Sequence, residues 1–482
     1  MSTKVTITRA FGLIKICPLI PDLLQELSFN YRFRDKIKKR IFDRRLNKMR
    51  DLFVDGPMRV IKKNLYSITK DDNGIITFDG LFKRVSNFLS MRNIECEILQ
   101  ADKIYVTPEI SERVFEGLYA DQKCAVELML DHDGGCMIEA ATNTGKTRII
   151  TSLCRAYSQF HGLVVTNRQS VATKLYKDLQ ELAPECDPGV YLTSSKKRGR
   201  TLVITSASLD KFDENSVDFI IYDEAHGAAS EVRSKELLRY KTAVKYGMSA
   251  TIKTNFKGID KYLEAIFGPI VFELTDQQLE AMSRATPLHV YVMVIDAGPN
   301  FGPKAQSLTM ERNGIWFNRH RNKIIKECVD RAPSDQQLIV YVRTLTHLEE
   351  LKFNFLSSDF EAFHGKLPAK EKKRVLEGFN TGSIKRIIST DCLAEGVDPK
   401  NLYVIINANC MQSDVSVLQK AGRNRRLTEG KDFGIIIDFD DSWNDKTERK
   451  ASNRIKHYRD KGYKIINNAN PSQLEFIKNG ND

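Results

Sequence analysis

The middle of the chain alternates between short apolar runs and amphipathic stretches. We predict strands at residues 136–139, 163–166, 202–205, 219–222 and 245–248, and helices around 120–130, from 146, and over 170–182. Apolar strands separated by helices are typical of a parallel sheet that is covered on both faces.

The same pattern restarts after Pro287. Here we predict strands at 338–342, 384–389, 403–408 and 434–439, with helices at 345–355 and 370–379. Two such sheets in tandem imply a cleft between them, and clefts are where ligands bind.

The first hundred residues have a different pattern. The segment Tyr31–Arg50 carries ten Lys or Arg against two Asp, and it can be a helix or an extended arm along a duplex backbone, or a solvated basic helix packed on its own domain. Strand-like segments at 64–69 and 75–78 flank a turn, and a helix follows over 81–91. We therefore expect an α/β protein with a small α+β N-terminal domain (1–105), a first parallel-sheet domain (106–285) and a second one (286–482).

Composition adds two constraints. The 74 basic and 62 acidic residues give a net charge of +12, which favours a polyanionic partner, although the excess is spread widely and can serve solubility alone. The nine cysteines lie far apart with no Cys-x-x-Cys pair, as expected for reduced intracellular thiols. With no signal peptide or membrane-length apolar run, we expect a soluble protein of the cytoplasm (the bacterial host's, for a phage protein).

A phosphate-binding loop follows the first predicted strand of the middle region. It reads Ala-Ala-Thr-Asn-Thr-Gly-Lys-Thr over residues 140–147. The backbone N–H groups of Thr142, Asn143, Thr144 and Gly145 can surround a nucleotide's phosphates. The Lys146 ammonium would then balance the negative charge of these phosphates. The Thr147 hydroxyl would then be a ligand of Mg²⁺.

A pair of carboxylates ends another apolar strand. Asp223 and Glu224 begin an Asp-Glu-Ala-His sequence, where one carboxylate can hold the metal shell and the other can activate water. The two motifs in this order predict a protein that hydrolyses a nucleoside triphosphate.

The second sheet contributes a loop and a basic helix. The loop 388–398 follows a strand, and Gly396 allows close approach to a ligand. Gln-Lys-Ala-Gly-Arg-Asn-Arg-Arg at 419–426 puts Arg423 and Arg426 on one helical face, where an arginine can stabilise the charge on a γ-phosphate. In isolation the same arginines would be read as a solvated helix end.

As an ordered set, these motifs resemble those of the superfamily 2 helicases and translocases. The set comprises 140–147, Asp223–His226, Ser-Ala-Thr at 249–251, the loop 390–398 and Gln-x-x-Gly-Arg-x-x-Arg at 419–426. The chain is most similar to the UvsW-type phage helicases that remodel branched DNA, on the segments 121–126 and 316–322, the N-terminal Phe-Asp-Gly-Leu-Phe at 78–82 and a short tail after 440. The resemblance implies two RecA-like domains, ATP with Mg²⁺, and a DNA substrate.

It also implies roles for single residues. Asp223 would hold the metal through water, and Glu224 would deprotonate the attacking water. His226 would couple these carboxylates to Ser249 and Thr251. The remaining roles fall to Gln122 (adenine edge), to Gly396 and Asp398 (ribose) and to Gln419, Arg423 and Arg426 (the second domain's share of the site).

Two positions depart from the family pattern. Asn143 stands where many relatives have glycine, and Asp121 stands where an aromatic residue often precedes the adenine-reading glutamine. Tyr119 could supply that stacking surface instead.

The resemblance further implies contacts to one nucleic-acid strand at the ends of predicted strands. These positions are Thr166, Arg168, Thr205, Ser206, Arg343 and Thr390. Phosphate contacts of this kind need no base information, although Ser and Thr at strand ends also serve as ordinary loop caps.

Our expectation is a monomeric ATP-dependent DNA helicase for forks and four-way junctions, working with recombination or replication proteins. The alternatives are an RNA helicase, the motor subunit of a restriction-type nuclease, and a DNA-binding protein with a decayed motor. No nuclease carboxylate cluster is recognisable, and the wording at 167–169 and 419–423 differs from that typical of RNA helicases.

Overall fold

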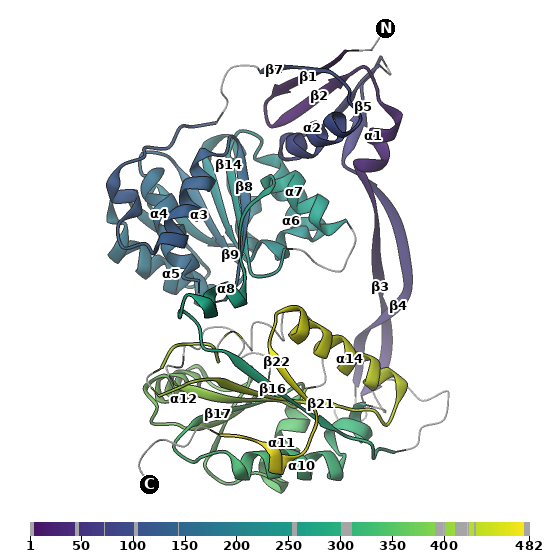
Figure 1. Ribbon diagram of the computed structural model, residues 1–482, viewed down its shortest axis with the longest axis vertical. Helices are drawn as coiled ribbons and strands as arrows, with labels where there is room; N and C mark the ends of the chain where they lie inside the picture. Colours follow the sequence, from purple (N-terminus) through teal and green to yellow (C-terminus); the bar gives the residue numbers. More distant parts are fainter. Residues whose placement is uncertain are drawn as a thin grey trace. The chain divides into compact units, whose positions relative to one another are not determined.

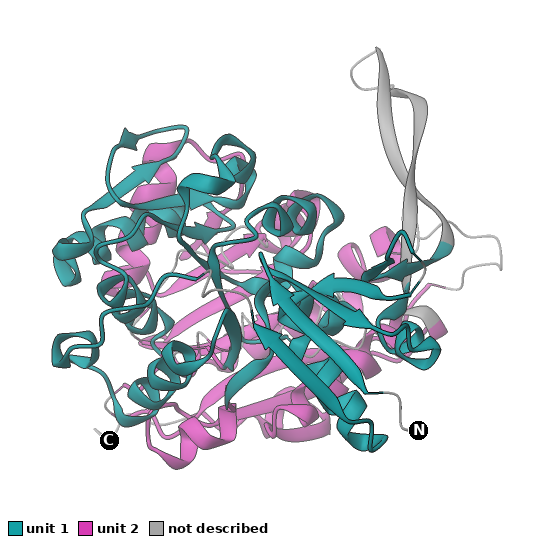
Figure 2. Ribbon diagram, turned by 90° about the horizontal axis from the view of Figure 1, so that it is seen from above, with its two compact units in different colours: residues 1–140, 145–273 teal, residues 141–144, 274–482 magenta. Residues whose placement is uncertain are grey.

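The computed structural model describes most of the chain in two compact units (Figure 2). It covers residues 4–43, 48–71, 73–100, 105–142, 144–252, 258–299, 311–390, 399, 401–409, 422, 424–428 and 430–476, with the backbone alone for 31–43, 48–58 and 446. Unit 1 comprises residues 1–140 and 145–273, and unit 2 comprises residues 141–144 and 274–482.

Unit 1 begins with a small five-stranded sheet in the order β5-β6-β2-β1-β7. Its strands are β1 (Val5–Ala10), β2 (Leu13–Cys17), β5 (Tyr66–Ile68), β6 (Ile75–Phe78) and β7 (Cys96–Gln100), and its helices are α1 (Pro21–Glu26) and α2 (Phe82–Met91). Alternate residues of β1 and β2 point inward, and they form one core with the apolar face of α2.

A long antiparallel ribbon lies between β2 and β5 in the sequence. It consists of β3 (Ser28–Asp43) and β4 (Lys48–Asn64), which pair only with each other (Figure 1). The pairing runs from Ser28 opposite Asn64 to Asp43 opposite Lys48. The described parts of the basic segment, residues 31–43 and 48–50, are thus extended, and the helical alternative is wrong for them.

The larger sheet of unit 1 has eight strands in the order β11-β10-β12-β9-β13-β14-β8-β15. They are β8 (Gly135–Ala140), β9 (Gly162–Thr166), β10 (Pro188–Tyr191), β11 (Lys196–Lys197), β12 (Thr201–Thr205), β13 (Phe219–Asp223), β14 (Val244–Ser249) and β15 (Ile270–Leu274). The pairs from β10 to β8 are all parallel.

Helices cover both faces of this sheet. The core on one face includes residues of α3 (Ala120–Asp131), α4 (Lys146–Ala156) and α5 (Gln169–Leu182). The core on the other face includes residues of α6 (Glu231–Arg239) and α7 (Ile259–Phe267). This is the doubly covered parallel sheet that the apolar runs predicted.

The small sheet is docked by close contacts between backbones on α7 and on Lys241, which precedes β14. A Cβ on Gly80 would lie 2.2 Å from the Glu264 carbonyl oxygen, and one on Gly12 would lie 2.3 Å from that of Lys241. Beside these contacts, Arg84 Nε donates to Glu264 Oε2 at 2.8 Å. Only glycine fits at the two contact points, so the small sheet and the large sheet are held at a fixed spacing.

Unit 2 contains a seven-stranded sheet, parallel throughout, in the order β18-β19-β17-β20-β21-β16-β22. Its strands are β16 (Leu288–Val294), β17 (Gln337–Val342), β18 (Phe360–Phe363), β19 (Arg386–Thr390), β20 (Leu402–Asn407), β21 (Gly434–Asp440) and β22 (Lys464–Ala469). One face is covered by α10 (Arg319–Arg331) and α11 (Leu345–Asn354), and the other by α12 (Ala369–Thr381) and α14 (Asp445–Asp460).

The predicted fold class is confirmed: two parallel α/β sheets follow a small α+β region. In the second sheet and its covering helices, the strands β16, β18 and β22 and the helices α10 and α14 were not predicted. The chain after residue 440 is therefore no simple tail, because α14 and β22 complete the second sheet. The division at residues 105 and 285 into three domains stays a prediction.

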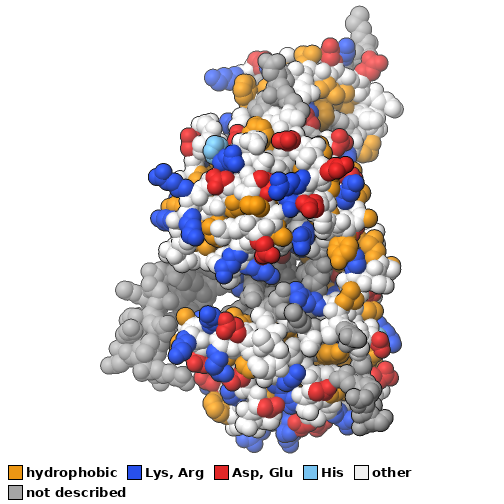
Figure 3. Space-filling model, turned by 90° about the vertical axis from the view of Figure 1, so that its left-hand side faces the viewer, with side chains coloured by type: hydrophobic (Ala, Val, Ile, Leu, Met, Phe, Trp, Pro, Cys, Tyr) orange, Lys and Arg blue, Asp and Glu red, His pale blue; other side chains and the backbone are white. Residues whose placement is uncertain are grey.

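The described surface mixes the two signs of charge. On the face in Figure 3, Lys and Arg side chains alternate with Asp and Glu. Among the described residues, none of the helices combines the length and apolar character needed to cross a bilayer.

Candidate functional site

The phosphate loop connects β8 to α4, and its glycine is required by backbone shape and by space. Gly145 caps α4 with φ of 80°, and a Cβ there would lie 2.4 Å from Gln122 Nε2. The N-terminal turn of α4 then presents backbone N–H groups and a partial positive charge, which suit a phosphate.

The Lys146 side chain lies along this loop. Its ammonium donates to the Ala140 carbonyl oxygen at 3.1 Å, at the end of β8. Thr144 is buried, and Thr142 and Thr147 are half-buried. Asn143 lies outside the described residues.

The two predicted carboxylates lie at the end of β13, on the same edge of the sheet. Strand β14 separates β13 from β8, and Asp223 is opposite Met248 while Ser249 is opposite Glu139. Asp223, Ser249 and the start of the phosphate loop therefore leave the sheet together, because the carboxyl ends of parallel strands share one edge.

The environment separates the two carboxyl groups chemically. Burial, and then the charge of Glu224, raises the pKa of Asp223 to about 6. Burial also works to raise the pKa of Glu224, but the hydrogen bond from His226 and the charge of Lys146 outweigh it and lower that pKa. Glu224 is therefore the more acidic member of the pair.

Glu224 also has an unusual backbone. Its φ is 55°, in the left-handed region, and its N–H donates to Asp223 Oδ1 at 3.0 Å. This conformation costs a residue with a Cβ about 1–2 kcal/mol. Such strain persists where the surrounding contacts impose it, as at functional sites.

His226 links the carboxylate pair to β14. Its Nδ1 lies 3.4 Å from Glu224 Oε2 and 3.0 Å from Ser249 Oγ. Ser249 Oγ in turn accepts from the Thr251 N–H at 3.2 Å. The structure thus brings His226, Ser249 and Thr251 into one chain of contacts that ends on Glu224.

Gln122 lies beside the phosphate loop in a structural role. Its side chain is buried, and Oε1 accepts from the Tyr119 N–H at 3.0 Å to close a capping box at the start of α3. Tyr119 is 62% exposed, so its ring is accessible for stacking. Recognition of adenine by these residues stays a prediction.

The unit 1 residues expected to contact nucleic acid lie on the same carboxyl edge. Thr166 and Thr205 end β9 and β12 and pair directly with each other, with Ser206 next in the chain. Arg168 caps α5, and its carbonyl oxygen accepts from Thr166 Oγ1 at 3.2 Å.

In unit 2, Arg343 and Thr390 also lie at strand ends. Thr390 pairs with Val342, directly before Arg343. The Arg343 guanidinium donates to Glu311 Oε2 at 2.7 Å.

The arginine motif is described only in part. Gly396, Asp398, Gln419 and Arg423 lie outside the described residues. Arg426 is half-buried, and its carbonyl oxygen accepts from Thr286 Oγ1 at 2.9 Å.

Sequence reasoning missed Arg425, the arginine between the two predicted ones. It is fully buried and donates to both Asp276 and Glu280. The available signal was the crowding of three arginines in four residues, more than a γ-phosphate requires.

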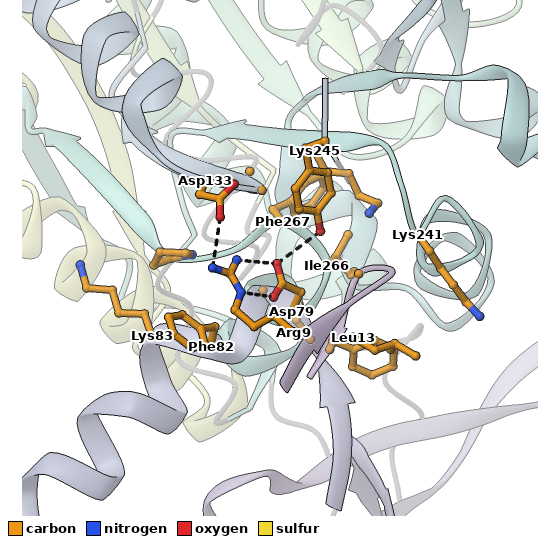
Figure 4. Close-up of a pocket in the computed structure, with 18 of the residues that line it drawn as sticks. Arg9, Leu13, Asp79, Phe82, Lys83, Asp133, Lys241, Lys245, Ile266 and Phe267 are labelled. Atoms are coloured by element: carbon orange, nitrogen blue, oxygen red, sulfur yellow. Dashed lines mark hydrogen bonds and ion pairs between the residues drawn. The ribbon is translucent and has the colours of Figure 1, made fainter. Parts of the chain in front are cut away.

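A cavity of about 190 Å³ lies elsewhere in unit 1 (Figure 4). It is lined from the small sheet by Arg9 and Asp79, which are paired at 2.8 Å, and from the large sheet by Gly135 and Lys245. Gly135 begins β8 and Lys245 is the second residue of β14, so the cavity is at the amino edge, opposite Lys146. It is therefore separate from the phosphate loop.

Two family models match the chain. Residues 109–254 match the model described as "Type III restriction enzyme, res subunit", and residues 320–428 match the "Helicase conserved C-terminal domain". Together they span the phosphate loop and the acidic box of unit 1, and most of the second sheet with its arginine motif.

Curated relatives are distant helicases. Helicase 22 of the Sulfolobus islandicus filamentous virus (isolate Iceland/Hveragerdi) is 21% identical over 342 residues, which are 63% of this chain and 60% of that protein. The ATP-dependent RNA helicase ROK1 of Lodderomyces elongisporus is 22% identical over 355 residues, 66% of this chain and 58% of that protein. The chain thus spans about three fifths of the length of these relatives.

Solved structures share the fold at low identity. The match to Saccharomyces cerevisiae Dbp5 bound to RNA and ADP BeF3 covers 74% of this chain and 94% of that chain, at 16% identity and a TM-score of 0.53. T4 UvsW covers 97% and 100%, at 16% identity and a TM-score of 0.41, which is too low to support the narrower UvsW-type resemblance. The two family models match the segments that contain the motifs, in the same order along the chain. On this basis the chain belongs to the superfamily 2 helicases.

Proposed function

We propose that the protein is an ATP-dependent DNA helicase or translocase that unwinds or branch-migrates forks and four-way junctions, in phage-type recombination, replication or repair. The observation that supports it most is that Lys146, Asp223 and Glu224 lie at one sheet edge. His226 Nδ1 lies between Glu224 Oε2, at 3.4 Å, and Ser249 Oγ, at 3.0 Å.

The chemistry of the carboxylates fits Mg²⁺ and ATP. Thr147 and Asp223 offer the oxygen ligands that Mg²⁺ prefers. A divalent cation would also relieve the repulsion between Asp223 and Glu224 that helps to raise the pKa of Asp223. Bound Mg²⁺ neutralises charge on the phosphates during transfer. Asp223 would act on it through water, while Lys146 and the loop N–H groups of residues 142–147 hold the β- and γ-phosphates.

Glu224 is proposed as the general base. Because its pKa is lowered, its carboxylate is ionised at neutral pH and can accept a proton from the attacking water. Arg423 and Arg426 would stabilise the γ-phosphoryl charge from the second sheet, Gly396 and Asp398 would lie near the ribose, and Gln419 would join coupling to His226, Ser249 and Thr251. Gln122 would contact the adenine edge.

DNA would be held by its phosphates. Thr166, Arg168, Thr205, Ser206, Arg343 and Thr390 would contact one strand, and such contacts cannot tell a junction from a simple tail. We therefore assign the preference for branched DNA to residues 1–105, where the basic segment 31–50, extended over 31–43 and 48–50, adds charge for a second duplex arm.

One assay tests the proposal. ATP hydrolysis is measured with single-stranded DNA, duplex, four-way junction and RNA, in wild type, Lys146→Ala and the exposed-lysine control Lys177→Ala. We expect stimulation by branched DNA and loss of turnover only in Lys146→Ala, because that change removes the phosphate counter-charge without opening a core cavity. Near wild-type turnover in Lys146→Ala would refute the nucleotide site.

The other stimulation patterns identify the alternatives. Stimulation by RNA alone would make the protein an RNA helicase. The "Type III restriction enzyme, res subunit" match over 109–254 favours a restriction-type motor as the second candidate. Such a motor would translocate on plain duplex with no preference for junctions.

The basic segment has its own test. Reversing Arg32, Arg34, Lys38 and Lys39 to Glu should weaken four-way-junction binding and flatten its salt dependence, because fewer counterions are released. ATPase stimulated by single-stranded DNA should persist. Unchanged junction binding and an unchanged salt slope would transfer junction selectivity to another part of the chain.

A further inference from the structure

The buried guanidinium of Arg425 is tied to one segment of unit 2. This segment, the connector (residues 275–287), follows β15 and precedes β16, and it contains α8 (Asp276–Ala281). Arg425 donates from Nη1 to Asp276 Oδ1, and from Nη2 to Asp276 O at 2.8 Å and Glu280 Oε1 at 2.9 Å. The side chain is fully buried, and so is Asp276.

The backbone on either side of Arg425 is held by the same segment. The Thr286 N–H donates to Arg425 O at 2.8 Å, and Thr286 Oγ1 donates to Arg426 O at 2.9 Å. The connector therefore grips residues 425 and 426 through a side chain at one end and through two carbonyl groups at the other. The position of the Arg426 backbone is set by the connector.

The connector also reaches the phosphate loop. From the connector, Arg284 Nη2 donates to Thr144 O at 3.2 Å. Next to it, the O of Leu274, the residue directly before the connector, accepts from the Ala141 N–H at 3.0 Å, and all four residues belong to unit 2. One short segment thus contacts backbone groups of the loop proposed to hold the phosphates and of the arginine proposed to stabilise the γ-phosphoryl charge.

We infer that Arg425 is a positioning residue that, with Thr286, fixes Arg426 to the connector in the geometry that hydrolysis needs. The inference rests on the proposed ATP hydrolysis. The Arg425 guanidinium is buried against Asp276 and Glu280, so we assign its effect on turnover to the placement of Arg426. A displacement of about 1 Å at such a site can cost as much as 100-fold in rate.

The test compares conservative changes at matched buried ion pairs. Arg425→Lys keeps the charge but loses the forked contact with Asp276 and Glu280. Arg454→Lys makes the same change at the equally buried Arg454–Asp438 pair, which joins α14 to β21. Thr286→Val removes only the bond to Arg426 O and keeps the side chain's volume.

We measure kcat with a stimulating DNA, and the binding of a non-hydrolysable ATP analogue, at a temperature where each variant is folded. Arg425→Lys should lower kcat about tenfold or more and Thr286→Val severalfold, with analogue affinity within about threefold of wild type, as for groups that act on the transition state. Arg454→Lys should leave kcat within about twofold.

Each other outcome overturns the inference. Unchanged kcat in Arg425→Lys and Thr286→Val would show that the connector does not position Arg426. A loss of kcat in Arg454→Lys equal to that in Arg425→Lys, or a parallel loss of analogue affinity, would show a general effect of weakening unit 2. Absence of ATPase in wild type with any nucleic acid would refute the proposed function itself, which is a distinguishable result.

Discussion

The two parallel sheets use charged residues in opposite ways. In unit 1, Asp223 and Glu224 stand side by side with Lys146 and His226 near them, and their pKa values are pulled apart. In unit 2, charges are buried as closed pairs, such as Arg321 with Asp441 at 2.8 Å and Arg454 with Asp438 at 3.0 Å. In the first arrangement, the repulsion between the two carboxylates can be relieved by a bound cation. In the second, each charge is already neutralised by its partner.

The difference teaches where reactivity and rigidity are placed. A carboxylate that is raised in pKa by a like charge gains from a bound cation. In a fully buried ion pair the two charges already neutralise each other, so a bound cation would add no such stabilisation. The pair instead joins elements of unit 2: Arg321 also donates to Ala408 O, one residue beyond the end of β20. We expect substitutions of the Asp223–Glu224 pair to change chemistry, and substitutions that break a closed pair such as Arg321–Asp441 to change stability.

The largest effect should come from Glu224→Gln in unit 1. Removing the proposed base should lower turnover on the order of 10²–10⁴-fold while Mg²⁺ and an ATP analogue still bind. Steady-state hydrolysis and analogue binding check this. If weakened nucleotide binding is the main defect, Glu224 belongs to the metal shell.

The second effect should be on the stability of unit 2. Arg321→Met should lower the free energy of unfolding by about 3–5 kcal/mol, because it leaves the Asp441 carboxylate buried without its partner. Urea denaturation of the unit 2 transition measures the loss. The double change Arg321→Met with Asp441→Leu should recover much of it, since well-packed apolar pairs replace buried ion pairs at little cost; a double variant no more stable than Arg321→Met would contradict this account.

A third effect is on pH dependence. The pKa of Asp223 is raised to about 6, so the stability that its protonated form contributes is lost as pH rises through about 6. Metal binding needs the ionised form. We therefore expect kcat/KM for Mg·ATP to fall about tenfold per pH unit below about pH 6.

The control for this profile is Asp223→Asn. ATP phosphates titrate near the same pH. Only a limb that is present in wild type and absent from Asp223→Asn belongs to the carboxyl group, and identical profiles would assign it to the substrate.

The smallest effect should come from exposed charges of unit 2. Arg374 pairs with Glu361 at 3.1 Å on the surface, where solvent screens the charges. Arg374→Ala should leave the urea midpoint unchanged within experimental error. If Arg374→Ala lowered stability as much as Arg321→Met, burial could not explain why the two ion pairs differ in their contribution to stability.

The sequence was most informative where burial and composition agree. Strands such as β17 and β20 are buried throughout, so they read as apolar runs. Helix α14 escaped prediction because it is rich in Lys, Arg and Glu and buries Arg454 against Asp438. A buried arginine is indistinguishable in sequence from a solvated one.

The same limit applied to the site. The sequence predicted the phosphate loop and the Asp223–Glu224 pair each at the end of a strand, and the structure brings both to one sheet edge because the strands are parallel. The contacts of Arg425 with Asp276 join residues 149 positions apart, and no local pattern announces such a pair. For the segment that forms much of the ribbon, the sequence allowed both a helix and an extended arm. Its many charged residues obscure the alternation of polar and apolar positions that is typical of a strand.

The glycine contacts at Gly80 and Gly12 give the ribbon mechanical leverage. Because they fix the small sheet against α7 and Lys241 at backbone spacing, the base of the ribbon, where Ser28 is opposite Asn64, turns with unit 1. The 16 residues of β3 span roughly 50 Å at the usual rise of an antiparallel strand. A turn of unit 1 by about 10° would then move the far end of a rigid lever of this length by roughly 9 Å. This displacement corresponds to roughly two to three base-pair steps at about 3.4 Å each. A probe placed along the ribbon would magnify small rotations of the motor into displacements that single-molecule distance measurements can follow.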